Sequence, residues 1–252
     1  MKWQIQNISK EFRQDNGIVA ALSDISLRIL PGEFVCFVGP SGCGKSTLLN
    51  LIAGLEKPTS GNICIEGKLG LMFQEPTLFP WLKVKDNVAF GLKIAQEDKE
   101  EIKKKVDYYL KLVHLKPFQE AYPHELSGGM KQRVALARTL ILDPDILLMD
   151  EPFASLDAQT REILYLELQE IWKITKKTIL FVTHNVREAV CLGDRVLVFT
   201  ARPGRIKKEF KINLPRPRDL GNLEVIKISN EIKEELKEEI DKVIKEMEHF
   251  GT

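Results

Sequence analysis

The stretch from Gly39 to Thr47, GPSGCGKST, combines residue types that suit the binding of a phosphorylated ligand. Its glycines allow sharp turns, and the helix expected from about Lys45 would direct its positive end and unpaired N–H groups into the loop. Lys45 adds a full charge, and the Ser46 hydroxyl suits a hard cation such as Mg²⁺. The spacing fits the phosphate-loop pattern G-x-x-x-x-G-K-[ST]. We therefore expect the phosphates to be bound by Gly39, Pro40, Ser41, Gly42, Cys43, Gly44, Lys45, Ser46 and Thr47.

Two acidic residues, Asp150 and Glu151, follow the apolar run ILLM. Ligands of open parallel sheets bind beyond the carboxyl ends of the strands, so these carboxylates are expected near the phosphate loop. Asp150 would then act on Mg²⁺, and Glu151 would polarise an attacking water as a general base. The alternative is a strand that ends in solvated acids, and the phosphate loop upstream favours the catalytic interpretation.

Two later motifs add candidate ligand contacts. In LSGGMKQR, Ser127 is expected to cap a helix whose first turn contains Gly128 and Gly129. Glycine costs helix stability, and close approach of another molecule's phosphate to the helix start would explain it. In ILFVTHN, His184 follows a buried run at the same expected sheet edge. A lone histidine is more commonly structural, but this placement favours contact with the ligand.

The pattern of apolar residues predicts an α/β fold. Continuous apolar runs, which suit central strands of a parallel sheet covered on both faces, occur at 34–38, 146–150, 178–182 and 195–199. Half-buried or short strands are expected at 3–8 and 25–29, and in the segments GNICIEG and KLGLMF. The stretch 97–112 is predicted to form a charged helix with an apolar stripe formed by Ile102, Val106, Tyr109 and Leu110.

These elements predict an α/β fold with a parallel sheet core that carries the phosphate loop, a second kind of sheet and an inserted helical subdomain. The core domain would span about 1–220, with the helical insertion at about 76–145. A charged amphipathic tail would follow at 221–252, with an apolar stripe formed by Ile228, Ile232, Leu236, Ile240, Val243 and Met247. Its polar face mixes acids and lysines, which favours packing on its own domain or on a twin subunit over a membrane surface.

Composition sets broader limits. The 252 residues carry a net charge of +1, so no global basic field indicates nucleic-acid binding. Four cysteines are scattered without a C-x-x-C pair, which is typical of reduced thiols rather than a disulfide framework or a zinc site. The amino-terminal residues lack the apolar core of a signal peptide, and no apolar run approaches the ~20 residues of a membrane helix. The sequence thus predicts a soluble chain.

With these motifs in this order, residues from about 1 to 220 resemble the ATP-binding subunit of an ABC transporter. The loop at 39–47 is similar to the Walker A motif and ILLMDEP to Walker B. The other family motifs correspond to Gln74 of the Q-loop, Ser127 of the signature, Asp157 of the D-loop and His184 of the switch. The resemblance implies a phosphate-loop (RecA-like) parallel sheet core with an antiparallel β subdomain and an inserted helical subdomain. It implies further that ATP and Mg²⁺ are bound, with the metal held through Ser46, Gln74 and Asp150.

The resemblance also implies roles in catalysis. Lys45, Glu151 and His184 would act on the γ-phosphate and the attacking water. Phe12 would stack on adenine, and a core position is the alternative for this ring. In the family's commonest signature the residue after the two glycines is glutamine. This chain has Met130 there and Gln132 two residues later. Which glutamine contacts nucleotide is therefore left open, with Gln132 the candidate. Asp157 of one copy would lie across the dimer interface from the other copy.

Two stretches, 74–92 and 201–219, resemble importers of the nitrate, sulfonate and taurine group. The first stretch places four residues close together beside the Q-loop, namely Phe79, Pro80, Trp81 and Leu82. Exposed aromatic residues of this kind suit a groove that receives a partner's helix, and the alternative is that they fill the joint of the subdomain. The implied partners are a second copy of the chain with ATP between them, multi-span membrane permease subunits and a solute-binding protein, with no nucleic acid. The implied location is the cytoplasmic face of the membrane, through the permease.

Three other classes are kept as alternatives. A small phosphate-loop kinase would need an acceptor site and has no use for the signature helix. A related ATPase of chromosome maintenance would carry a long coiled coil before the signature, and one of translation would generally carry two ATPase halves. A regulatory module that binds ATP without turnover is disfavoured by the presence of Glu151.

Overall fold

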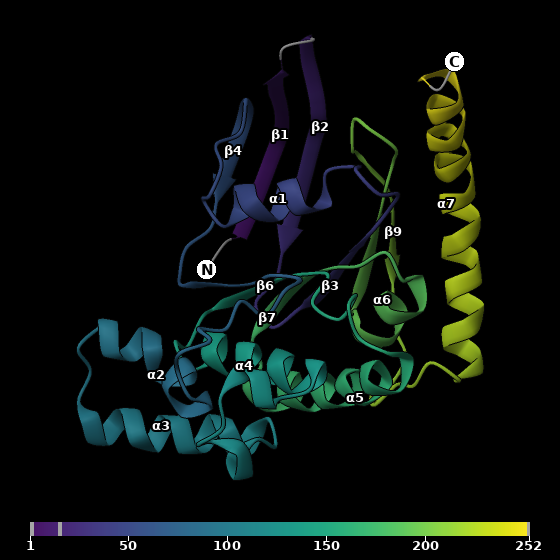
Figure 1. Ribbon diagram of the computed structural model, residues 1–252. Coiled ribbons are helices and arrows are strands. Elements are labelled where there is room, and N and C mark those ends of the chain that lie inside the picture. The colour runs from purple at the N-terminus through teal and green to yellow at the C-terminus, as the bar shows by residue number, and fades with distance from the viewer. Residues whose placement is uncertain (1–2, 15–16, 251–252) are drawn as a thin grey trace. The chain divides into compact units, whose positions relative to one another are not determined.

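A computed structural model describes residues 3–14 and 17–250, with side chains described except at 14 and 246–250. The chain divides into two units. The first runs up to Glu66 and resumes at Thr178, and the second is Gly67–Lys177. Figure 1 labels most of the helices and strands of both units.

An antiparallel sheet of three strands in the first unit has the order β2-β1-β4. Its strands are β1 (Trp3–Gln14), β2 (Gly17–Ile29) and β4 (Ser60–Cys64). Alternate residues face a buried side, as the period-two pattern of β2 predicts. The expected strands at 3–8 and 25–29 are present but longer, because β1 and β2 continue toward one another with Gln14 opposite Gly17.

The parallel strands of the first unit have the order β7-β3-β8, and β9 pairs antiparallel with β8. Three of them coincide with the expected apolar runs: β3 (Phe34–Val38), β7 (Thr178–Val182) and β8 (Arg195–Phe199). The fourth, β9 (Ile206–Lys211), was not predicted, because its lysine-rich sequence belongs to an edge strand whose side chains are half-buried or exposed. Phe37 lies opposite Val182 of β7 on one side and Leu197 of β8 on the other. The carboxyl ends of all three parallel strands therefore lie at the same edge of the sheet.

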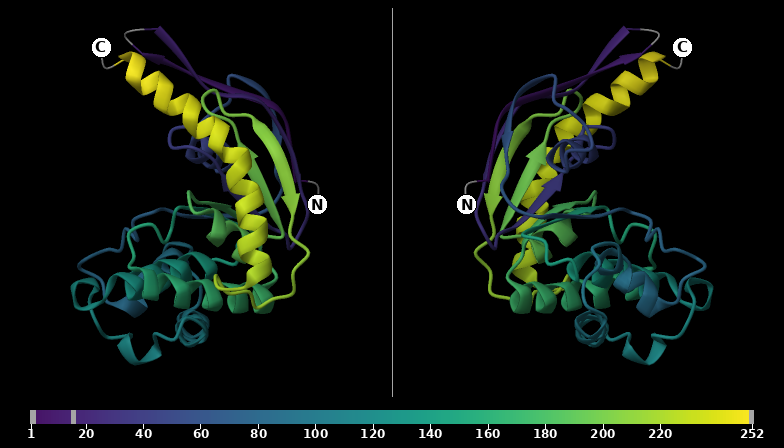
Figure 2. Two further views of the ribbon diagram at one scale, coloured as in Figure 1. Left: turned by 90° about the vertical axis from the view of Figure 1, so that its right-hand side faces the viewer. Right: turned by 90° about the vertical axis from the view of Figure 1, so that its left-hand side faces the viewer.

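Among the described residues, the first unit has three helices: α1 (Lys45–Ile52), α6 (Val186–Leu192) and α7 (Leu223–Phe250). Figures 1 and 2 show α7 running beside β9, and Lys208 of β9 forms an ion pair with Glu235 of the helix at 2.6 Å. The expected apolar stripe of this tail is partly wrong. Ile240 is 45% exposed, and the buried face of the helix is formed by Val225, Ser229, Ile232, Leu236 and Glu239. The side chain of Met247 lies outside the described residues.

The proline-rich segment before α7 is anchored by Arg218, whose side chain is buried. Its guanidinium donates hydrogen bonds to the carbonyls of Val190 at 2.9 Å, Gly193 at 2.6 Å and Ile212 at 3.2 Å. Burial lowers the pKa of Arg218 to about 10, so it stays charged at neutral pH. A charged fork that satisfies the carbonyl end of α6 therefore fixes the path of the chain toward α7.

The second unit contains a parallel pair, β5 (Leu69–Met72) and β6 (Ile146–Asp150), with helices around it. The helices are α2 (Val84–Ile94), α3 (Lys99–Leu112), α4 (Gly128–Leu140) and α5 (Ala158–Thr175), with short 3₁₀ turns at Lys116–Phe118 and Pro123–Glu125. The expected helix at 97–112 begins two residues later, because the Asp98 carboxylate caps it through the N–H groups of Glu100 and Glu101.

Candidate functional site

The phosphate loop joins β3 to α1 in the first unit. Gly44 has φ 96° at the start of α1, and a Cβ there would lie 2.7 Å from the carbonyl oxygen of Ala21. Both the left-handed backbone and the close contact require glycine at this position. Gly42 also has positive φ, 74°. The sharp turns expected from the sequence are therefore present in the loop.

Lys45 is only 5% exposed, and its ammonium group is held by the loop itself. Nζ donates to the carbonyls of Gly39 and Pro40, each at 2.9 Å, and lies 3.5 Å from the sulfur of Cys43. Burial raises the pKa of the Cys43 thiol, which keeps it neutral beside the lysine. The result is a concave backbone loop that holds one fixed positive charge, an arrangement that suits an anionic phosphate chain.

His184 follows β7 at the same edge of the sheet as the phosphate loop. The N–H of Thr183 donates to the carbonyl of Phe37 at 3.1 Å, so β7 stays paired with β3 up to the residue before the histidine. On its other side Asn185 caps α6 through the N–H groups of Arg187 and Glu188. A buried strand end and a helix cap thus fix the backbone on both sides of an exposed imidazole.

In the second unit, β6 ends at Asp150 with its preceding four residues buried. Glu151, which follows, has φ 45°, in the left-handed region that non-glycine residues seldom occupy. Its carbonyl accepts a hydrogen bond from the N–H of Ala154 at 3.1 Å, which closes a turn at once after the strand. A strained, sharply turned acid at a strand end is a feature of functional sites.

The signature helix α4 begins as predicted, with the Ser127 hydroxyl accepting a hydrogen bond from the N–H of Met130 at 3.3 Å. A Cβ on Gly129 would lie 2.4 Å from Cγ2 of Thr160 in α5, and one on Gly128 would lie 3.1 Å from Leu156. Close packing of α4 on α5 therefore gives Gly129 a role within the chain that the sequence interpretation missed.

Gln132 is 1% exposed, and its Nε2 donates to the backbone carbonyl of Gln74 at 2.7 Å. A side chain of the signature helix thus holds the Q-loop backbone. Arg138, further along α4, donates to the carbonyls of Pro76 and Thr77, both at 2.8 Å. Sequence analysis missed this arginine, since nothing in the spacing shows that it lies beside the Q-loop.

Two remaining candidates have clear local environments. Phe12 lies on β1 with a partly exposed ring, and Nζ of Lys10 sits 4.7 Å from the ring centroid, a cation–π distance. Asp157 caps α5 by accepting from the N–H of Thr160 at 2.9 Å, and this bond lowers the pKa of its carboxyl group. The ring is thus available on the sheet surface, and Asp157 is an ionised helix cap.

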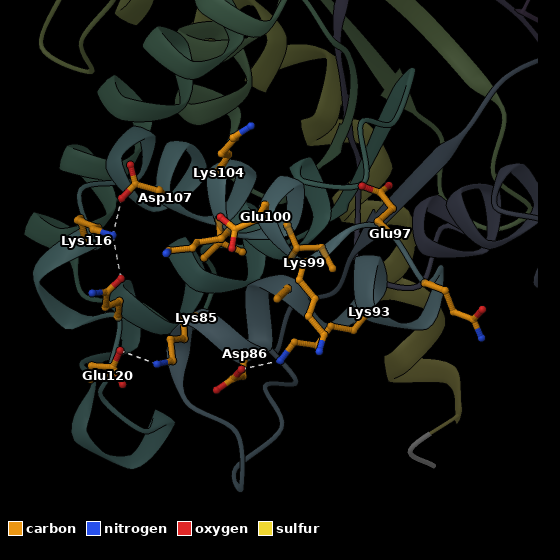
Figure 3. A pocket seen from close by; sticks show the side chains of 16 residues that line it. Lys85, Asp86, Lys93, Glu97, Lys99, Glu100, Lys104, Asp107, Lys116 and Glu120 are labelled. Carbon is orange, nitrogen blue, oxygen red and sulfur yellow. Dashed lines mark hydrogen bonds and ion pairs between the residues drawn. The ribbon is translucent and has the colours of Figure 1, made fainter.

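Two hollows lie in the second unit. One, of about 1040 Å³, lies along α2 and α3, and Figure 3 shows that charged side chains from both line it. Lys85 pairs with Glu120 at 2.6 Å and Lys93 with Asp86 at 2.6 Å, so much of its charge is already neutralised. The other, of about 480 Å³, is lined by the Q-loop, α2 and α4, including Phe79. The second hollow therefore adjoins the candidate site residues.

No group of three or more His, Cys, Asp or Glu side chains suited to a metal ion occurs in the part of the chain that is described. Mg²⁺ usually takes only one or two protein ligands and completes its shell with water and phosphate oxygens. Ser46, Gln74 and Asp150 carry hydroxyl, amide and carboxylate oxygens, the hard donors that Mg²⁺ prefers.

The buried lysine in a glycine loop, the acid pair at a strand end and the capped two-glycine helix define a phosphate-loop ATPase of the ATP-binding cassette type. Residues 22–154 match the family model described as ABC transporter. The nitrate import ATP-binding protein NrtD of Synechocystis sp. is 48% identical, covering 92% of this chain and 90% of the relative. The taurine import ATP-binding protein TauB of Roseobacter denitrificans is 48% identical, covering 82% and 81%.

A solved dimeric ATP-binding cassette in a post-hydrolysis state, bound to ADP and Pi, superposes with a TM-score of 0.74. It is 33% identical, and the comparison covers 84% of this chain and all of that one. The chain therefore belongs to the ABC transporter family, as one of its ATP-binding ATPase chains. The fold class expected from the sequence is confirmed. Within the described residues, no helix is both long enough and apolar enough to cross a bilayer.

Proposed function

We propose that this chain is the ATP-hydrolysing subunit of a membrane importer for a small anionic solute, such as nitrate or a sulfonate like taurine. The observation that carries the proposal is the phosphate loop with its buried Lys45, in a chain close in sequence to nitrate and taurine import subunits. These relatives favour transport over the alternative of nucleic-acid maintenance or translation.

We propose that two copies enclose ATP, with the phosphate loop of one copy facing Ser127, Gly128 and Gly129 of the other. The dimeric cassette that resembles this chain supports the arrangement. Asp157 would take part at the same interface. Gln132 would act by holding the Q-loop rather than by reaching the nucleotide, since its side chain is buried and bonded to Gln74.

Each catalytic residue has one task in this proposal. Lys45 binds the phosphate chain, Glu151 accepts the proton of the attacking water, and His184 contacts the γ-phosphate from the neighbouring strand end. Mg²⁺, bound through Ser46, Gln74 and Asp150, would neutralise phosphate charge. Phe12 would stack on the adenine ring.

The hollow beside the Q-loop is the proposed contact with the membrane permease. Phe79 packs against Phe90 with ring centroids 4.3 Å apart and against Trp81 at 5.6 Å, while Trp81 is 70% exposed. An aromatic cluster with one large exposed member suits insertion of a partner's helix. The chain would thus lie at the cytoplasmic face of the membrane, peripheral through the permease, and a solute-binding protein would complete the system.

We also propose the domain division expected from the sequence: an ATPase domain at 1–220, with a helical insertion at about 76–145, and a tail at 221–252. The stretch of helices α2 to α4 supports the insertion. The packing of α7 against β9 supports a tail that belongs to its own subunit.

The substitution Glu151→Gln tests the proposal. It keeps the size of the side chain but removes the charge that accepts a proton, so ATP hydrolysis should fall about 10²–10⁴-fold while ATP binding persists. The variant should accumulate as an ATP-bound dimer in size-exclusion chromatography, and the wild-type chain should be mainly monomeric. Glu170→Gln, on the exposed side of α5, is the matched control and should behave like wild type.

Two results would contradict parts of the proposal. Wild-type hydrolysis by Glu151→Gln would exclude Glu151 as the general base. A Glu151→Gln chain that binds ATP but stays monomeric would count against the shared nucleotide site and leave the base assignment unaffected.

A further inference from the structure

The segment Ala201–Arg205, which follows β8, packs directly against the phosphate loop. Gly204 donates its N–H to the carbonyl of Ala21 at 2.9 Å, and its own carbonyl accepts from the N–H of Ser23 at 3.0 Å. A Cβ on Gly204 would lie only 2.0 Å from the carbonyl oxygen of Cys43. Backbone therefore meets backbone here, and the segment forms a support on one side of the loop.

Arg202 makes the polar contact between this support and the loop. Its Nε donates to the carbonyl of Gly42 at 3.1 Å. A peptide group is planar, so holding this carbonyl also fixes the N–H of Cys43 on the opposite side. That N–H points to the carbonyl of Pro40 at 3.4 Å, the same oxygen that accepts from Lys45 Nζ at 2.9 Å. The hydrogen bond from Arg202 thus orients the peptide between Gly42 and Cys43, which in turn helps to position Lys45.

The other end of the support is held by the tail helix. Glu239 of α7 is 2% exposed, and its Oε2 accepts from the N–H of Ala201 at 2.9 Å. The same carboxylate pairs with Lys242 at 2.8 Å and with Lys207 of β9 at 3.3 Å. Burial would raise its pKa, but the bonds from Lys242, Ala201 and Lys207 outweigh burial and lower it. A buried, ionised side chain of the tail therefore holds the residue next to Arg202.

We propose that Arg202 and Glu239 are positioning residues that connect the tail helix to the phosphate loop and so set its affinity for nucleotide. The path runs from Glu239 through Ala201 and Arg202 to Gly42. Neither side chain touches the reacting atoms in this proposal. It rests on the proposed function in one respect, namely that the phosphate loop binds the phosphates of ATP.

The experiment compares variants that keep or remove the donor of Arg202. In Arg202→Gln the nitrogen Nε2 occupies the same place along the side chain as Nε of arginine, so the donor stays and the charge is lost. Arg202→Met has similar length and no donor. Arg205→Met is the matched control, because that guanidinium bonds the hydroxyl of Ser23 at 3.0 Å and not the phosphate loop. All are made in the full chain.

The dissociation constant of ADP with Mg²⁺ is measured by titration calorimetry, together with KM and kcat for ATP hydrolysis. One lost hydrogen bond that acts at a distance from the ligand should weaken binding about fivefold. We expect this in Arg202→Met, with KM raised and kcat unchanged within about twofold. Arg202→Gln and Arg205→Met should stay within about twofold of wild type. A purely structural role would lower the thermal midpoint without separating KM from kcat.

Glu239 supplies a second measurement from the other end of the path. Glu239→Ala leaves the buried N–H of Ala201 without its acceptor and should weaken ADP binding in the same direction. Glu239→Gln keeps an oxygen in place and should bind nearly as wild type does. Wild-type affinity in both Arg202→Met and Glu239→Ala, or equal weakening in Arg205→Met, would overturn the inference.

Lys45→Ala separates this inference from the proposed function. If Lys45→Ala loses ADP binding while Arg202→Met and Glu239→Ala bind normally, the positioning role alone is wrong. If Lys45→Ala binds ADP as wild type does, the phosphate-binding role of the loop is wrong and the inference fails with it.

Discussion

Replacing Gly129 by alanine tests the contact between the start of α4 and α5. On the observed backbone the new Cβ would lie 2.4 Å from Cγ2 of Thr160, whereas non-bonded carbon atoms rest at about 3.5–4.0 Å. The two helices must therefore separate by about 1 Å at this point. Overpacking of this kind costs about 1–3 kcal/mol, and alanine in place of a helical glycine returns at most about 1 kcal/mol. We expect a net loss of about 1 kcal/mol in the free energy of unfolding.

The second substitution Thr160→Ser identifies the cause. Serine lacks the methyl group that overlaps, and the next atom, Cβ of Thr160, lies 3.9 Å from the place that the new carbon would occupy. The double variant should recover about 1–2 kcal/mol relative to the sum of the single changes. Urea unfolding of the four chains gives this coupling energy. Additive effects, or a neutral Gly129→Ala, would show that the new methyl group does not clash with Thr160.

Three further results are expected. Lys45→Ala should abolish ATP binding and turnover while circular dichroism shows an intact fold, and near-normal turnover would exclude the phosphate-loop assignment. Ser127→Arg should leave ATP binding by a single subunit nearly unchanged and eliminate hydrolysis, whereas a proportional fall in both would place the signature in the same subunit's pocket. The pKa of the Glu239 carboxyl is lowered in the folded chain, so its ionised form stabilises the fold above the ordinary glutamate pKa of about 4.3, and this contribution is lost as pH falls below that value toward the lowered pKa. Between about pH 5 and 3, Glu239→Gln should therefore lose less thermal midpoint than wild type, and equal losses would show that Glu239 does not stabilise the fold in this way.

The buried strands were predictable because burial on both faces produces an uninterrupted apolar run. The bounds of β3, β7 and β8 follow the runs at 34–38, 178–182 and 195–199. Exposed strands carry no such signal. The outer part of β1 is largely polar and is held by pairing with the outer part of β2, and the lysine-rich sequence of β9 resembles that of a loop.

The tail shows that one buried polar side chain can change which face of a helix is buried. Apolar spacing alone placed Ile240 on the buried side, but the helix instead buries Glu239, since that carboxylate has a backbone N–H and two lysines to bond. A buried acid with several partners cannot be recognised from spacing, because two of those partners, Ala201 and Lys207, lie about 30 to 40 residues earlier in the chain.

Local chemistry of the site was predictable where it depends on neighbours in sequence. Ser127 and Asp157 cap their helices as their residue types and positions imply. The supports of the site were not predictable, since Gln132, Arg138 and Arg202 act on backbone groups 58 to 160 residues away. Sequence spacing shows which residues could bind a phosphate, and only the fold shows what holds them there.

The exposed indole of Trp81 gives the chain an optical signal at the proposed permease contact. The chain has three tryptophans; Trp3 is buried and Trp172 is half-buried. Trp81 should therefore contribute the long-wavelength, water-exposed part of the intrinsic emission, and the quencher acrylamide should reach it first. Capture of this ring by a partner's apolar helix would shift the emission to shorter wavelength and shield it from quencher. Docking could thus be followed in unlabelled protein, with Trp81→Phe as the chain that has lost the signal.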